Sequence, residues 1–422
     1  MNSGKCVVWI VTLLLLSALP VQADRLDDME KQIQDLQQEL QQLKKEKARE
    51  VEKQDEKMAE LEDKIEPPGF LDRTNIGGYM ELHYNDTVGG ENSSRDEQLD
   101  FHRFVLLFSH QLSDWIQFYS EVEIEHAFIE GGEESGEVEL EQAYVDFLTG
   151  EHLNYRAGVF LTPVGIINQY HEPATFNGVE RPFVDTVIIP TTWSESGAGI
   201  FGSLVPGLSY QLNLMGGLEA EEFSASSGLR GGRQKAFKTN LEDLAVAARL
   251  DYSAIPGLAL GASYYRGDSA QDLDINADVK TSIWEGDFRY STGGFDFRGQ
   301  VALVDIGDAA KLNTVLGKTS GINAVAEELF GWYVEGAYRF LPLLIKNSAQ
   351  DAALFVRYED YDTQHDMPSG FSENPAFDRE ALTFGLTYWP IANLAIKADY
   401  QDLKNAAGTG EDLFNLGIGW EF

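Results

Sequence analysis

Apolar and polar residues alternate along most of the chain from Ile76 onward. This pattern predicts β-strands, because neighbouring side chains of a strand face opposite sides. The last segment shows it best, with an apolar residue at every second position from Phe414 to Phe422. The alternation predicts sixteen strands, near residues 76–85, 99–110, 114–126, 137–148, 152–161, 195–204, 208–216, 241–252, 258–266, 279–290, 294–305, 331–340, 351–361, 379–389, 393–403 and 412–422.

The connections between these segments alternate between long and short along most of the chain. Short ones contain turn-forming pairs such as Pro206-Gly207, whereas long ones include residues 162–194 and 217–240. Strands of about ten residues joined in this way are typical of outer-membrane β-barrels. We therefore predict an all-β fold, a 16-stranded antiparallel transmembrane β-barrel over residues 76–422. A soluble β-sandwich is the alternative, but it does not explain the tyrosines and tryptophans near strand ends, which are typical of a membrane interface.

Residues 24–66 follow a different period and contain neither glycine nor proline. Apolar residues recur there at alternating spacings of three and four, at Leu26, Met29, Ile33, Leu36, Leu40 and Leu43. This spacing predicts an α-helical coiled coil, and therefore an oligomer. A single solvated helix or a disordered linker is the alternative. Pro67 and Pro68 cannot continue a helix, so we expect a linker over residues 67–75.

Residues 1–23 have the pattern of a secretory signal peptide. Lys5 precedes an apolar run from Val7 to Leu19, and small residues follow up to Ala23, where we expect cleavage. Cys6 is the only cysteine and lies within this segment, so disulfide scaffolds and cysteine-rich metal sites are excluded for the rest of the chain. Export would place the coiled coil in the periplasm and the barrel in the bacterial outer membrane.

The composition excludes several classes of function. The 422 residues include 69 Asp and Glu against 32 Lys and Arg, a net charge of −37, which argues against a nucleic-acid partner. The sequence contains no HExxH or GxSxG motif, so we expect neither an enzyme nor a cofactor. Acidic residues alternate over 272–278, but the glycine and the final glutamate of an EF-hand are missing. We therefore predict no dedicated metal site, and weak divalent binding by acidic loops stays open.

A short stretch in the first half of the chain resembles a known family. The sequence EQAYVD at 141–146 is followed by AGVFLTPVG at 157–165. Together they resemble the EQAY and G-x-F-x-x-P-x-G stretch of the phosphate-selective (O/P-type) porins and their coiled-coil-bearing relatives. The resemblance implies a homotrimer that acts as a passive pore. It also implies that the loop 162–194 folds into the barrel and constricts it, with charged candidates Glu172, Glu180, Arg181 and Asp185.

The sequence departs from that family in one respect. Phosphate-selective members resemble one another in a constriction rich in lysine and arginine, whereas here Arg181 is the only Lys or Arg in the loop. We therefore do not carry phosphate specificity over. The final strand, with Trp420 and a terminal Phe422, resembles the carboxy-terminal membrane-insertion signal of outer-membrane proteins. This implies the barrel-assembly machinery, outer-membrane lipid and lipopolysaccharide as partners.

A barrel of sixteen strands is expected to enclose a water-filled channel lined by polar side chains. By alternation, the acidic side chains that face inward are Glu81, Glu121, Glu123, Glu125 and Asp146. The basic ones are Arg103, Arg156, Arg249, Arg289, Arg298, Arg339, Arg357 and Lys397. Such charges set the selectivity of a pore. Alternatively, the inward charges pair with one another. Acidic residues that alternate with the arginines of the later strands favour this alternative: Asp287, Asp296, Glu335, Glu359 and Asp399.

These patterns predict an outer-membrane porin, a passive diffusion channel for small hydrophilic solutes, charged ones included. Its selectivity would depend on the inward charges and the loop 162–194. The alternative is a structural protein whose periplasmic coiled coil tethers the envelope to peptidoglycan. A barrel whose middle is filled with apolar side chains would contradict a channel.

Overall fold

The computed structural model describes residues 31–32, 34–54, 57, 69–90, 97–127, 136–345 and 348–422. The predicted signal peptide lies outside the described residues, and so do residues 67–68 of the predicted linker. The chain divides into two compact units, residues 1–69 and residues 70–422.

Residues 34–54 of the first unit form a continuous helix. The segment is rich in Glu, Gln, Lys and Leu, which favour helix intrinsically. Leu36, Leu40 and Leu43 are 62, 54 and 62 % exposed on this helix. The predicted helix is confirmed over these residues, and its association into a coiled coil stays a prediction. Among the described residues, no helix is long and apolar enough to span a bilayer.

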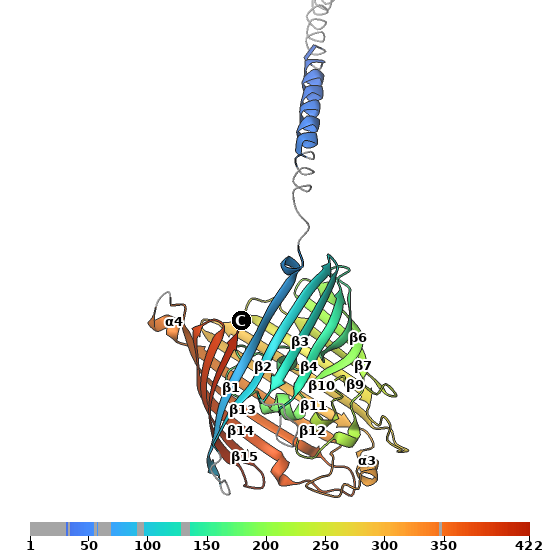
Figure 1. Ribbon diagram of the computed structural model, residues 1–422, viewed down its shortest axis with the longest axis vertical. Coiled ribbons are helices and arrows are strands. Elements are labelled where there is room, and N and C mark those ends of the chain that lie inside the picture. Colours follow the sequence, from blue (N-terminus) through green and yellow to red (C-terminus); the bar gives the residue numbers. More distant parts are fainter. Residues whose placement is uncertain are drawn as a thin grey trace, which may run out of the picture. The chain divides into compact units, whose positions relative to one another are not determined.

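In the second unit, sixteen antiparallel strands of described residues form one closed barrel (Figure 1). The strands are β1 (Thr74–Gly90), β2 (Glu97–Ser113), β3 (Ile116–Glu125), β4 (Val138–Phe147), β5 (Asn154–Leu161), β6 (Ser194–Val205), β7 (Leu208–Gly216), β8 (Leu244–Tyr252), β9 (Leu258–Asp268), β10 (Lys280–Thr292), β11 (Phe295–Ile306), β12 (Glu328–Arg339), β13 (Asp351–Asp366), β14 (Asp378–Ile391), β15 (Leu394–Asn405) and β16 (Glu411–Glu421). Every strand predicted from the alternation is present, so the closed sixteen-strand antiparallel barrel is confirmed. Its placement across a membrane stays a prediction.

The first and last strands close the wall. Tyr79 pairs with Glu421 and Met80 with Trp420 in an antiparallel register. The Phe422 N–H donates to the Gly78 carbonyl at 2.9 Å, and the Gly78 N–H donates to the Phe422 carbonyl at 3.1 Å. The final residue therefore belongs to the seam of the barrel, and its predicted role in membrane insertion stays a prediction.

The outer face of the barrel carries large apolar side chains. They alternate along the strands with buried inward residues, and at least a third of each is exposed: Leu212, Leu214, Val246, Leu250, Trp284, Phe288, Val301, Val334, Val356, Phe384, Leu416 and Trp420. A soluble protein rarely exposes so many large apolar groups around its whole circumference. An outward apolar band is what a barrel in lipid requires.

Short helical segments lie in the connections between strands. They are η1 (Leu71–Arg73), α2 (Ile166–Gln169), η2 (Val184–Ile188), η3 (Ala220–Glu222), η4 (Arg230–Gly232), α3 (Ala309–Val315), α4 (Leu341–Leu344) and η5 (Pro375–Phe377). The connection between β5 and β6, residues 162–193, contains α2 and η2, and we call it the interior loop.

Candidate functional site

The interior loop lies inside the barrel. Its backbone N–H groups donate to side chains of well-separated strands: Ile166 to Gln300 of β11 at 2.8 Å, and Val179 to Asp399 of β15 at 2.6 Å. On the other side, Glu180 lies 3.1 Å from His83 of β1. A loop can reach inward side chains of strands spread around the wall only from the interior.

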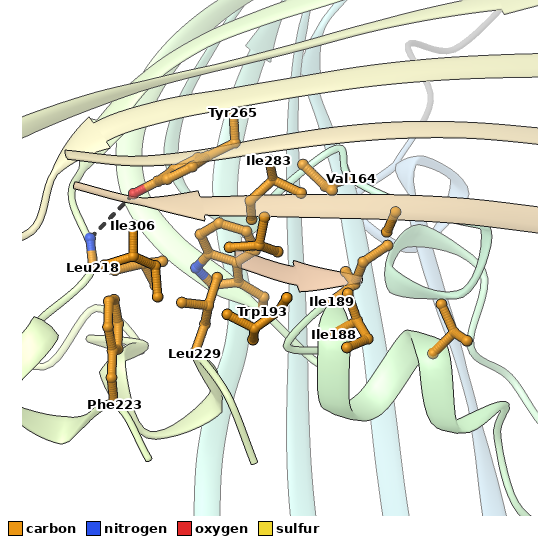
Figure 2. Packing of buried hydrophobic residues seen from close by; sticks show 14 of the residues in the cluster. Val164, Ile188, Ile189, Trp193, Leu218, Phe223, Leu229, Tyr265, Ile283 and Ile306 are labelled. Atoms are coloured by element: carbon orange, nitrogen blue, oxygen red, sulfur yellow. Dashed lines mark hydrogen bonds between the residues drawn. The ribbon is translucent and has the colours of Figure 1, made fainter. Parts of the chain in front are cut away.

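One sector of the interior is apolar. Val164, Ile188 and Trp193 of the interior loop are buried against inward residues that include Ile283 of β10 and Ile306 of β11 (Figure 2). The connections after β7 and β11 add further apolar groups: Leu218, Phe223, Leu229, Ala309 and Leu312. This cluster has no access to water, so it is a packed core inside the barrel.

The expectation that inward residues are polar all round the wall is therefore wrong for this sector. Ile283, Val304 of β11 and Leu329 of β12 face inward and are buried. Long connections fold into the barrel at these positions, and covering them removes apolar area from water. An inward position can therefore be apolar where a connection covers it.

Gln300 of β11 ties together the two ends of the interior loop. Its Oε1 accepts the N–H of Ile166, and its Nε2 donates to Oδ1 of Asp185 at 2.9 Å. The chain reaches Ile166 through Gly165, which has φ +82°, a conformation that L-residues with a side chain rarely adopt. A Cβ at Gly165 would lie 3.0 Å from Cδ1 of Ile189 and 3.3 Å from Oε1 of Gln300. The last glycine of the G-x-F-x-x-P-x-G stretch thus permits both the turn and the close packing.

Arg357 anchors the middle of the interior loop. Its side chain is fully buried, and it pairs with Glu359 at 2.8 Å and with Glu335 at 3.4 Å. It also donates to the carbonyl of Asn177 at 3.4 Å, and Asn177 in turn donates to Glu335 at 2.9 Å. This burial does not support the pore-lining role predicted for Arg357, because its guanidinium is sealed between wall and loop.

Lys397 is buried under the same loop, and no carboxylate of the described residues forms an ion pair with it. Its Nζ lies 3.8 Å from the ring centroid of Phe176, which is a cation–π contact. Among the described residues it has no hydrogen-bond partner. Arg289 also faces an aromatic ring of the loop, at 5.5 Å from the centroid of Tyr170.

Most other predicted basic residues form ion pairs. The pairs are Arg103 with Glu81 and Glu123, Arg156 with Asp146, Arg249 with Asp287, Arg298 with Glu335, and Arg339 with Asp296. The pairing interpretation of the inward charges is therefore confirmed for these residues. Glu121 instead accepts a hydrogen bond from Gln142 at 2.6 Å, and Glu125 is half-buried at the end of β3.

A cavity of about 480 Å³ remains between the interior loop and the wall formed by β1 and β2. Charged and ionisable side chains dominate its lining: Glu81, His83, Asp100, His102, Arg103, His126, Glu180, Arg181 and Arg230. His83 bridges Glu81 of its own strand and Glu180 of the loop, at 3.0 and 3.1 Å. Burial would raise the pKa of Glu180, but the hydrogen bonds from His83 and Asn85 and the charges of His83 and His102 together lower it to about 2.

Two arginines of the cavity are incompletely paired. Nη2 of Arg181 and Nη1 of Arg230 are buried and make no hydrogen bond within the described ranges. Burial, together with the nearby charges of Arg233 and Arg181, lowers the pKa of Arg230 to about 9. Among the described residues that line the cavity, Arg181 and Arg230 are the two arginines that form no ion pair with a carboxylate.

The four charged candidates of the interior loop have different positions. Glu180 and Arg181 line the cavity. Asp185 is buried against β11 through Gln300. Glu172 has one buried carboxylate oxygen that no described residue contacts by a hydrogen bond. Arg230 was not among the candidates for the constriction, because its position inside the barrel depends on how the connection 217–243 folds.

Comparison with known proteins gives a bacterial relative. No family model matches the chain. An uncharacterized protein of Aquifex aeolicus is 35 % identical over 359 residues, which cover 82 % of this chain and 79 % of that protein. The chain belongs to the family of this Aquifex protein.

Solved structures resemble the fold of this family member at low sequence identity. Salmonella typhi OmpF is 15 % identical over 85 % of this chain and 99 % of its own, with a TM-score of 0.57. The outer membrane channel DcaP of Acinetobacter baumannii is 13 % identical over 83 % of this chain and 97 % of its own, with a TM-score of 0.54. These similarities show a porin-type barrel fold, and the resemblance to the O/P-type porins in particular stays a prediction.

Proposed function

We propose that the protein is an outer-membrane porin, a passive diffusion channel for small hydrophilic solutes. The observation that carries the proposal is the closed barrel with an apolar outer face and, inside it, a cavity lined by charged groups. Such a barrel satisfies its backbone hydrogen bonds in lipid. The structural neighbours OmpF and DcaP support this function at the level of fold.

The apolar cluster restricts where solutes would pass. It extends along the wall from β5 to β14, where the inward connections cover it. The charged cavity lies on the side of β1 and β2. The proposed path therefore follows the wall of the first strands past the interior loop, where Glu180, Arg181 and Arg230 meet the solute.

Planar-bilayer recording of the purified protein tests the channel. We expect stepwise conductance, and purified protein that inserts into the bilayer without conducting would refute the proposal. Reversal potentials in a salt gradient then report selectivity. Arg181→Gln and Arg230→Gln should each shift permeability toward cations, because each removes a positive charge from the cavity. Arg339→Gln is the matched control, since Arg339 is 45 % exposed and paired with Asp296 away from the cavity.

The helix 34–54 supports self-association. Its exposed leucines, Leu36, Leu40 and Leu43, form an apolar seam that would be buried between helices of neighbouring chains. We infer a homotrimer joined by a periplasmic coiled coil, with lipid and lipopolysaccharide around the barrel and the barrel-assembly machinery acting on its final strand. Tethering to peptidoglycan through the coiled coil is the second candidate.

Deletion of residues 24–66 separates the two roles of the helix. If the helix serves assembly, the shortened protein keeps its conductance steps and loses its trimers in native mass spectrometry. Intact trimers combined with a detached outer membrane would instead favour the tether.

A further inference from the structure

A bulge in β4 brings two carboxylates together inside the barrel. Across the β3–β4 pair, Glu121 lies opposite Gln142, and the next residue, Val122, lies opposite Leu140, so Glu141 is an extra residue in β4. A bulge of this kind turns consecutive side chains to the same face and is frequent beside functional sites. Glu141 and Gln142 are both buried, and Gln142 donates to Glu121 at 2.6 Å.

His171 of the interior loop completes the group, and we call Glu121, Glu141 and His171 the interior triad. Its Nε2 lies 3.4 Å from Oε2 of Glu141 and 4.0 Å from Oε1 of Glu121. Its Nδ1 lies 3.2 Å from the carbonyl oxygen of Asn168. Because only a protonated Nδ1 can donate to a carbonyl, the lone pair of the neutral ring is on Nε2, which faces the carboxylates. Metal-binding histidines are commonly oriented in this way.

The interior triad has unsatisfied polar atoms. Both carboxylate oxygens of Glu141 and Nε2 of His171 are buried, and the described residues give them no hydrogen bond of good geometry beyond the 3.4 Å contact of Oε2 with Nε2. Leaving such atoms unpaired is costly, so each one in a native fold requires an explanation. Arg103 does not supply the missing partner, because it is already paired with Glu81 at 2.6 Å and Glu123 at 3.3 Å.

We propose that the interior triad binds one divalent transition-metal ion of the zinc type. Zinc binds oxygen and nitrogen at about 2.0–2.1 Å with tetrahedral geometry, which separates neighbouring ligand atoms by about 3.3 Å. The 3.4 Å between Glu141 and His171 matches this separation, and the 4.0 Å from Glu121 closes with a small side-chain movement. Calcium and magnesium prefer oxygen ligands alone, whereas an imidazole favours zinc and its neighbours.

A metal at this position would join three elements. Glu121 belongs to β3, Glu141 to β4, and His171 to the interior loop. The ion would fasten the loop to the wall opposite Gln300, and water would take the fourth coordination position. The proposal does not depend on the channel function, because it concerns only these described side chains.

Metal analysis of the full-length folded protein in detergent tests the proposal. The protein is stripped with EDTA, loaded with Zn²⁺ and desalted, and zinc per chain is measured by plasma mass spectrometry. We expect one zinc per chain and an X-ray absorption spectrum with a single imidazole among oxygen ligands. Glu141→Gln and His171→Gln should each weaken zinc binding at least tenfold in competition with a chelator.

A second cluster provides the control. In the cavity, Asp100 lies 3.2 Å from His102 and 2.9 Å from His126, so this cluster would offer two imidazoles. Asp100→Asn should leave the zinc content unchanged. A two-imidazole spectrum, or loss of zinc in Asp100→Asn alone, would overturn the proposal, and so would wild-type protein that retains no zinc. The wild-type spectrum decides between the two clusters even if Glu141→Gln does not fold.

Discussion

Asp185 makes docking of the interior loop dependent on pH. The side chain is completely buried, and among the described residues only its Oδ1 has a hydrogen-bond partner, Nε2 of Gln300 at 2.9 Å. Burial raises the pKa of Asp185 to about 7, and the hydrogen bond from Gln300 compensates only partly. An exposed aspartate has a pKa of about 3.9. These two pKa values differ by about three, so docking of the loop costs on the order of 4 kcal/mol once the carboxyl group is ionised.

Because docking raises the pKa of Asp185, docking becomes weaker as the pH rises. Below about pH 3.9 the carboxyl is protonated in both the docked and the released loop, so docking has no ionisation cost. Between that pH and about 7 the released loop loses its proton first, and docking weakens progressively. Above pH 7 the cost is constant.

Asp185→Asn removes this pH dependence. The side-chain oxygen of the introduced asparagine can still accept a hydrogen bond from Gln300. Its NH₂ group would take the place of Oδ2, which has no hydrogen-bond partner among the described residues. A buried NH₂ group without a partner costs about 1–3 kcal/mol. We therefore expect the loop of the variant to dock more tightly than wild type by about 1–3 kcal/mol at pH 8 and less tightly at pH 3. The two stability curves should cross.

Hydrogen–deuterium exchange of the peptide 182–193 measures this docking. After correction for the intrinsic exchange rate at each pH, protection at pH 8 should rise about tenfold to a hundredfold in the variant. Asp274→Asn, at an exposed position, is the control and should follow the wild-type curve. Equal pH slopes in wild type and Asp185→Asn would refute the reasoning.

Three further predictions concern the attachment of the loop. Gly165→Ala should weaken docking of the loop by about 1–2 kcal/mol, because residue 165 has a positive φ that alanine adopts only with strain. Hydrogen exchange in α2 should therefore be faster, and an unchanged exchange rate would show that the turn adapts. Arg357→Gln should lower the free energy of unfolding of the barrel by about 3–5 kcal/mol in urea titrations, because the buried carboxylates of Glu335 and Glu359 lose this partner. The control Arg339→Gln removes a more exposed ion pair and should lower it by less than about 1 kcal/mol. The Glu180–His83 pair should stabilise the docked loop above about pH 4.3, and this contribution should disappear as the pH falls toward 2. Protection of the loop from hydrogen exchange should therefore vary less with pH in Glu180→Gln than in wild type over that range.

The strands were predictable because each depends on local alternation. Every second residue from Phe414 to Trp420 faces the outside of the barrel, and the rule needs no knowledge of the partner strand. The rule failed inside the barrel. Ile283 and Val304 fit the alternation as inward positions, but their covering by distant connections cannot be inferred from their own strands.

The details of the site also depend on contacts between distant residues. The bulge at Glu141 leaves only a weak trace in the sequence, two consecutive polar residues where alternation calls for one. Arg357 was found by its inward position, but its burial depends on a loop more than 160 residues earlier, through carbonyl contacts with Asn177 and Glu180. Spacing along one strand indicates which side a charge faces and does not indicate what covers it.

The seam between β1 and β16 has a consequence for folding. Every other strand pair of the barrel joins neighbours along the chain, whereas this pair brings together residues more than 300 positions apart. An intermediate that contains only some of the hairpins therefore has two unpaired edges, and closing the cylinder requires both ends of the barrel segment. A variant without β16 would retain most of its hairpins and still present open edges to any neighbouring strand.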